Sequence, residues 1–143
     1  MRVTYDPPTD PAAYRFCHRL RARFAETDAM GVVHHAAYLP WLESARVEFL
    51  RAAGHPYTEV RQGGQEFPVA ELAVRYLRPV RFDDQVAVHL VLAAARGASF
   101  EIGYLVEVDG LPRLTAVTRH AVVGPDGRPG RCPAWLAALA VPA

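Results

Sequence analysis

Lysine is absent from this sequence of 143 residues, because all 16 basic residues are arginines. Chemistry that needs a lysine, such as a Schiff base or the lysine of a phosphate-binding P-loop, is therefore excluded. The two cysteines, Cys17 and Cys132, are too few for a disulfide framework or a structural zinc site. Net charge is also low, at +1, which argues against a broad electrostatic surface for nucleic acid.

Long apolar runs are absent as well. The longest candidate, VAVHLVLAAA, falls short of the about 18 residues of a membrane-spanning helix and carries His89 in its middle. The first residues, MRVTYDPPTD, lack the apolar segment of a signal peptide. We therefore expect a cytoplasmic protein without membrane insertion. Length and a hydrophobic content of 51% predict one domain over residues 1–143, with an irregular arm over 1–13 and a tail over 124–143.

Residues 36–53 have the periodicity of a single long helix. Tyr38, Leu42, Ala45 and Phe49 recur at spacings of four, three and four residues. Glu43, Ser44, Val47 and Arg51 lie mainly on the other side of this helix. Pro40 is tolerated in a first turn, and Gly54 and Pro56 are typical of the residues that follow a helix.

Beyond a glycine-rich connection at residues 61–65, the period changes to two, which predicts strands. The residues that share a strand face are Ala70, Leu72, Val74 and Tyr76, then Val86, Val88, Leu90 and Leu92, then Phe100, Ile102, Tyr104, Val106 and Val108. Asp109-Gly110 predicts a hairpin into a strand over 112–123, residues 14–24 suit a first strand, and AWLAALA suits a short final helix. The pattern predicts an α+β domain with an antiparallel sheet. One helix can cover only one face of this sheet. The second face is then exposed to solvent or covered by a partner, and the apolar content of the strands favours a partner.

Asp28 is the leading candidate for chemistry, because it lies in a loop directly before the predicted helix. A helix N-terminus offers unpaired N–H groups that can stabilise an oxyanion, and a carboxylate beside it can attack a carbonyl or activate water. The alternative is that Asp28 only forms an Asx-turn or caps the helix. His34 and His35 stand at the helix entrance, but adjacent histidines without a further ligand set do not predict a metal. Glu43 is placed to pair with Arg46.

The run ETDAMGVVHHAAYLPWLESARVEFLR, residues 26–51, resembles the signature of hotdog-fold acyl-CoA thioesterases of the 4-hydroxybenzoyl-CoA thioesterase family. The segment YLRPVRFDDQVAV, residues 76–88, resembles the same family's strand, turn and strand region. The resemblance covers about residues 15–123 and implies a five-stranded antiparallel sheet wrapped around one long helix.

The resemblance also implies roles for single residues. Asp28 matches the family's catalytic carboxylate, and His35 matches the position whose backbone N–H polarises the thioester carbonyl. By the same match, Val33, His34 and Tyr38 are expected to contact the substrate. Tyr38 and Glu43 match recurrent helix positions.

Three positions depart from the family pattern. Glu26 stands two residues before Asp28, where the family motif usually has an aspartate. His34 replaces an aromatic residue, and Ala37 replaces an asparagine before Tyr38. The loss of that asparagine removes a polar group near the site but leaves the Asp28 carboxylate in place.

By this resemblance we expect an acyl-CoA thioesterase for short- to medium-chain or aromatic acyl groups, with Asp28 as nucleophile or general base. We expect a homodimer or homotetramer with the substrate between subunits, and no cofactor beyond the coenzyme A of the substrate. Ala37 keeps a non-catalytic acyl-CoA- or acyl-carrier-binding module as the alternative. A hydratase on this fold is disfavoured, because Asp28 and His35 are seven residues apart, farther than the Asp–His pair of those enzymes. Candidates for contacts with the CoA phosphates are Arg75, Arg78, Arg81, Arg96 and Arg128.

Overall fold

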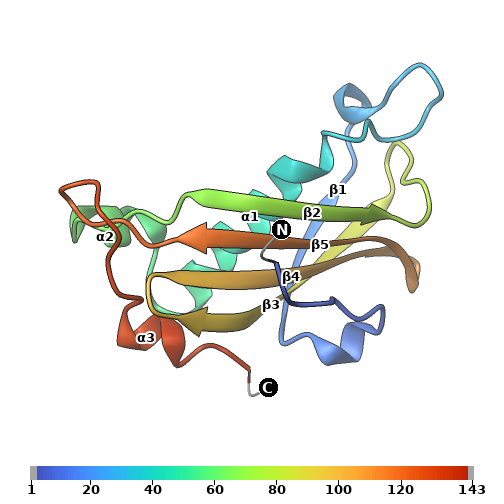
Figure 1. Ribbon diagram of the computed structural model, residues 1–143. Coiled ribbons are helices and arrows are strands. Elements are labelled where there is room, and N and C mark those ends of the chain that lie inside the picture. The colour runs from blue at the N-terminus through green and yellow to red at the C-terminus, as the bar shows by residue number, and fades with distance from the viewer. Residues whose placement is uncertain (1–2, 142–143) are drawn as a thin grey trace.

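One antiparallel sheet of five strands and one long helix form the molecule, as seen in a computed structural model that describes residues 3–141 (Figure 1). The strands are β1 (Phe16–Arg21), β2 (Val69–Tyr76), β3 (Gln85–Arg96), β4 (Ser99–Val108) and β5 (Leu111–Ala121). The helices are α1 (Tyr38–Ala52), α2 (Tyr57–Gln62) and α3 (Ala134–Ala137), and two short 3-10 turns are η1 (Pro11–Ala13) and η2 (Phe24–Glu26). The strand order is β1-β3-β4-β5-β2, so β1 and β2 are the edges. This is the hotdog architecture and confirms the predicted α+β fold.

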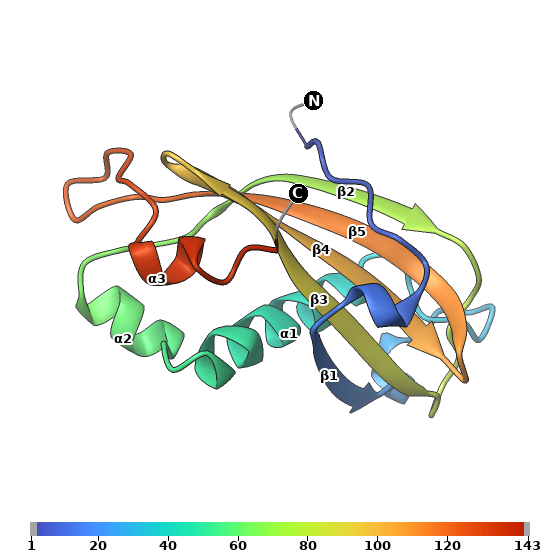
Figure 2. The same ribbon diagram turned by 90° about the horizontal axis from the view of Figure 1, so that it is seen from below.

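Helix α1 packs across one face of the sheet (Figure 2). Its buried residues follow the helical spacing and are Tyr38, Trp41, Leu42, Ala45 and Leu50. Pro40 is the third residue of the helix, where its missing N–H costs no hydrogen bond. The predicted helix is confirmed to within two residues at each end. Among the described residues, no helix has both the length and the apolar character needed to cross a membrane.

The inner face of the sheet, which faces α1, is built by alternating strand residues. Val86, Val88, Leu90 and Leu92 of β3 are at most 1% exposed and belong to the main core. On β2 the predicted alternation fails at one end. Val69 pairs with His120 while Glu71 pairs with Arg119, so Ala70 is the extra residue of a bulge. The expectation that Ala70 shares the face of Leu72 is therefore wrong, and Val69 takes that place.

The outer face of the sheet is covered in part by the chain's own N-terminal arm, residues 3–15 (Figure 2). Tyr14, 8% exposed, packs on Val91 and Leu105, and its hydroxyl donates to the Pro8 carbonyl oxygen at 2.8 Å. An arm of the same chain thus supplies part of the apolar cover of this face, which the sequence did not predict. The expectation of a partner on this face stays a prediction.

Two polar contacts and one glycine fix the start of this arm. The backbone N–H groups of Thr4 and Tyr5 each donate to Glu101 Oε1 at 3.0 Å. The Tyr5 ring lies against Gly103 in the middle of β4, at a spot that a Cβ atom there would occupy. Glycine at this strand position therefore lets the arm approach the backbone.

Candidate functional site

The loop between β1 and α1 holds Asp28 in a closed turn. Thr27 pairs with Val33, and Val32 pairs with the segment that precedes β3. The Asp28 N–H donates to the Val32 carbonyl oxygen at 2.8 Å. Gly31 has a φ of 77°, which residues with a side chain rarely adopt. The loop therefore returns on itself and leads directly from Asp28 back to the entrance of α1.

The two oxygens of the Asp28 carboxylate differ in their contacts. Oδ1 accepts a hydrogen bond from the Met30 N–H at 2.8 Å, which is the Asx-turn considered as the alternative. Oδ2 has no hydrogen-bond partner within residues 3–141. One oxygen thus stabilises the loop while the other remains open to a ligand, so the turn contact and a chemical role are compatible.

The two histidines are held at the helix entrance through their backbone. The His34 N–H donates to the Glu26 carbonyl oxygen at 2.8 Å, and the His35 carbonyl oxygen accepts from the Tyr76 hydroxyl at 2.7 Å. The His35 N–H has no acceptor in the part of the chain that is described. Both rings are exposed and 4.1 Å apart, and no three His, Cys, Asp or Glu side chains of residues 3–141 gather into a metal site.

Glu26 anchors the loop to α1. It is 8% exposed and accepts hydrogen bonds from the Trp41 indole N–H and the Arg23 backbone N–H, both at 2.7 Å. Burial opposes the charged form, but these bonds and the Arg23 guanidinium outweigh it and lower the pKa of Glu26. Sequence reasoning treated Glu26 only as a variant acidic position and missed this contact, because nothing local connects it to Trp41.

Val33 and Tyr38 lie beneath the loop in the core, at 5% and 3% exposure. The Tyr38 ring packs edge-on to Trp41 and Tyr76, with ring centroids 5.1 and 5.8 Å away. These contacts place both residues behind the loop, as its support. Their predicted contact with substrate stays a prediction.

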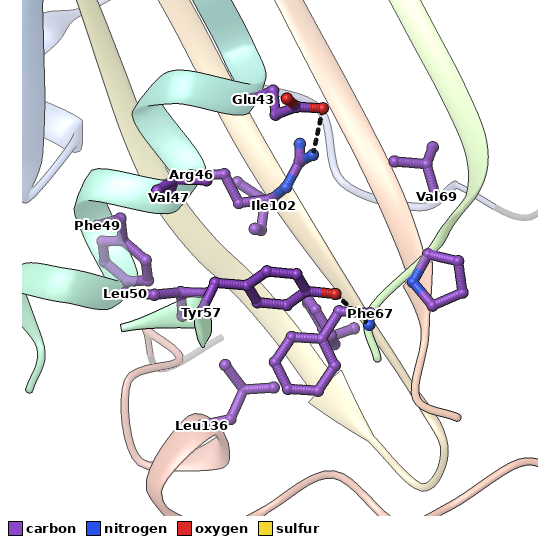
Figure 3. A pocket seen from close by; sticks show the side chains of 12 residues that line it. Glu43, Arg46, Val47, Phe49, Leu50, Tyr57, Phe67, Val69, Ile102 and Leu136 are labelled. Carbon is purple, nitrogen blue, oxygen red and sulfur yellow. Dashed lines mark hydrogen bonds and ion pairs between the residues drawn. The ribbon is translucent and has the colours of Figure 1, made fainter. Parts of the chain in front are cut away.

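A groove of about 350 Å³ lies farther along α1, between this helix, α2 and the sheet (Figure 3). Its walls include Val47, Phe49, Phe67, Phe100, Ile102 and Leu136. The charged residues that line it are Arg46 and Glu43, whose predicted ion pair is present at 4.0 Å. The sequence did not predict the groove. The one local sign of the groove in the sequence is Val47. This apolar residue lies outside the stripe of α1 residues that is buried in the core, and it lines the groove.

Comparisons with known proteins agree with this architecture. A model of the thioesterase-like superfamily matches residues 22–140. The solved structure of the hypothetical protein TT1821 from Thermus thermophilus is similar with a TM-score of 0.83 and 40% identity, covering 87% of this chain and 97% of that one. The 1,4-dihydroxy-2-naphthoyl-CoA hydrolase of Synechococcus sp. (strain RCC307) is 31% identical over 111 residues, which are 74% of this chain and 85% of that protein.

A third relative, the acyl-CoA thioester hydrolase YbgC of Escherichia coli O6:H1, is 34% identical over 80 residues, or 56% of this chain and 60% of that protein. These likenesses confirm the predicted family and the expectation of a thioester-hydrolysing enzyme. The match of one family model across the loop, α1 and strands β2 to β5 leads to one conclusion: the chain belongs to the thioesterase-like superfamily.

Proposed function

We propose that this chain hydrolyses the thioester bond of acyl-CoA carrying short- to medium-chain or aromatic acyl groups. The closed loop at the start of α1 carries the proposal, because it holds the open Asp28 oxygen and the unpaired His35 N–H in one short segment. Acyl transfer needs both kinds of group, one to attack the carbonyl or activate water and one to stabilise the oxyanion. The acyl-CoA names of two relatives support this substrate class.

In the proposed reaction the thioester carbonyl oxygen accepts a hydrogen bond from the His35 N–H, at the positive end of the α1 dipole. A donor of this kind contributes about 3 kcal/mol in other acyl-transfer enzymes. As nucleophile, Asp28 Oδ2 bonds to the carbonyl carbon and the C–S bond breaks. The thiolate of CoA leaves and takes a proton, and water then hydrolyses the anhydride. As general base, Asp28 instead takes a proton from the water that attacks the same carbon. The C–S bond then breaks, and the leaving thiolate of CoA takes up that proton from Asp28.

The position of the arginines favours some phosphate contacts over others. Arg81 and Arg78 are exposed and lie between β2 and β3, and the Arg81 backbone pairs with Val32 of the Asp28 loop. Arg96 ends β3 at the other end of the sheet, about 35 Å away along the strand. We therefore assign the CoA phosphates to Arg78 and Arg81 and not to Arg96.

A partner subunit belongs to this proposal. Leu72 and Tyr76 on the inner face of β2 are 38% and 51% exposed, and Leu39 at the start of α1 is 37% exposed. This apolar strip lies on an edge strand beside the helix entrance. Such a surface is typical of a contact between subunits. A homodimer or homotetramer with the substrate between subunits fits it.

The test is release of CoA thiol from aliphatic and aromatic acyl-CoAs, comparing wild type with Asp28→Asn. We expect turnover in the wild type and a loss of at least about 100-fold in kcat for the variant, since the amide neither attacks nor accepts the proton. Asp126→Asn is a matched control, because Asp126 Oδ1 also accepts from the N–H two residues on, at 3.0 Å. It should leave turnover unchanged.

The other outcomes are equally informative. Binding of acyl-CoA without turnover in the wild type would favour the non-catalytic module, for which the missing side-chain cap at Ala37 is the relevant feature. Turnover that survives Asp28→Asn would overturn the role of Asp28.

A further inference from the structure

The entrance of α1 is tied to strand β2 by a hydrogen bond between residues 41 positions apart in the sequence. The Tyr76 hydroxyl donates to the His35 carbonyl oxygen at 2.7 Å. Tyr76 is the last residue of β2, where its backbone pairs with the fully buried Leu114 of β5. The hydroxyl therefore connects the loop that carries Asp28 and His35 to the sheet.

The Tyr76 ring is held in place although about half of it is exposed. It packs edge-on to the Tyr38 ring, with the ring centroids 5.8 Å apart, and Tyr38 is itself 3% exposed. An aromatic side chain packed in this way keeps one rotamer, because the alternatives would lose the contact. The buried neighbour thus fixes the position from which the Tyr76 hydroxyl donates.

The peptide group that carries the His35 N–H lies between two other peptide groups, and each of the three makes a hydrogen bond. In the first, the His34 N–H donates to the Glu26 carbonyl oxygen at 2.8 Å. In the second, the His34 carbonyl oxygen accepts from the Ala37 N–H at 2.9 Å. In the third, the His35 carbonyl oxygen accepts from Tyr76. Because a trans peptide is planar, with N–H and C=O on opposite sides, these bonds together fix the direction of the His35 N–H.

Tyr76 supplies the one bond of these three that comes from outside the loop and the first turn. In the same third peptide group, the Ala36 N–H donates to His34 Nδ1 at 3.1 Å, so the Tyr76 hydroxyl completes the bonding of that group. Loss of the hydroxyl would leave the exposed His35 carbonyl oxygen to water. The peptide group directly after the His35 N–H would then be free to turn.

We propose that Tyr76 is a positioning residue for the His35 N–H. This inference rests on the proposed function, in which that N–H stabilises the oxyanion. The Tyr76 hydroxyl has a single proton, which it donates to the His35 carbonyl oxygen, so Tyr76 acts through the loop and not on the substrate. A fixed direction matters because a donor stabilises an oxyanion only when it already points at the place where the charge develops.

Steady-state release of CoA thiol from octanoyl-CoA, comparing wild type with Tyr76→Phe, is the first test. We expect kcat to fall at least about tenfold, since a small displacement of a catalytic group is costly. KM should change by less than about twofold, because the variant keeps the ring and removes only the hydroxyl. Light scattering should give the same mass for both proteins.

Tyr14→Phe is the matched control. The Tyr14 hydroxyl also donates to a backbone carbonyl oxygen, that of Pro8, at 2.8 Å, but it lies on the outer face of the sheet. This variant loses a bond of the same kind and should keep the kcat and KM of the wild type. A kcat that falls equally in Tyr14→Phe and Tyr76→Phe would show a general loss of structure and overturn the positioning role.

The infrared carbonyl stretch of bound octanoyl-CoA, isotopically labelled at the thioester carbonyl carbon, separates this inference from the proposed function. A hydrogen bond to the thioester oxygen lowers the stretching frequency. We expect a lowered frequency in Asp28→Asn, where the substrate persists, and a smaller shift when Tyr76→Phe is added. No shift in Asp28→Asn would overturn the role of the His35 N–H, and this inference with it. An equal shift with and without the Tyr76 hydroxyl would overturn the role of Tyr76 alone.

Discussion

At the scale of single residues, His120 gives the protein a pH-dependent stability. Its pKa is 6.5 in the unfolded chain and, because of burial and the Arg46 charge, about 4 when folded, so between these values the unfolded chain binds a proton that the folded chain does not. The free energy of unfolding therefore falls as the pH drops from about 6.5 to about 4, by about 3 kcal/mol for this group. Urea unfolding of wild type and His120→Gln at pH 7.5 and 4.5 measures this change in the free energy of unfolding.

We expect His120→Gln to be less stable than wild type at pH 7.5 but to lose less stability on acidification. His18→Gln, which changes a partly exposed histidine on β1, serves as the control and should follow the wild type. An equal loss in His120→Gln and wild type would rule out His120 as the titrating group.

At the residue level, positions could be predicted where the signal is contiguous, while the roles of these residues stay predictions. Asp28 and His35 stand within one run of sequence, so their neighbourhood could be read directly, and the structure places both in the same loop. The Glu26–Trp41 bond and the contact of His120 with the Phe67 carbonyl oxygen could not be predicted, because they join residues whose approach depends on how α1 and β5 pack.

At the scale of elements, the apolar stripe of the helix and the alternation of apolar residues in the strands were sufficient to predict α1 and most of the sheet. Helix α2 was missed because six residues are too few to show a period. The β2 bulge was missed because a single inserted residue breaks the alternation without changing composition. The arm was expected as irregular chain, but its contact with Gly103 depends on β4, far away in sequence.

The contact between the arm and β4 predicts the effect of Gly103→Ala. The added Cβ would collide with the Tyr5 ring and push the arm off the outer face, at a cost of about 1–3 kcal/mol in unfolding free energy. Limited trypsin digestion should then cut after Arg15 faster than in wild type. Gly130→Ala is the control, because the nearest atoms to its Cβ would be 3.8 Å away. Unchanged cleavage in Gly103→Ala would show that the arm is held independently of this contact.

At the scale of the whole molecule, the strip of exposed apolar residues on β2 predicts an oligomer. Light scattering at micromolar concentration should give at least the mass of a dimer for the wild type. Leu72→Glu places a charge in the strip and should give a monomer, whereas Leu111→Glu, at a similarly exposed leucine that begins β5, should not. A monomeric wild type, or an unchanged mass for Leu72→Glu, would contradict the subunit contact.

The Glu26 anchor has a consequence for the energetics of the proposed reaction. Its carboxylate holds Trp41 of α1 while its carbonyl oxygen holds the His34 N–H, so the loop and the helix form a single rigid unit. We therefore expect the dipoles around Asp28 and His35 to be oriented during folding and not to reorganise at each turnover, which is the condition under which fixed polar groups lower a reaction barrier most.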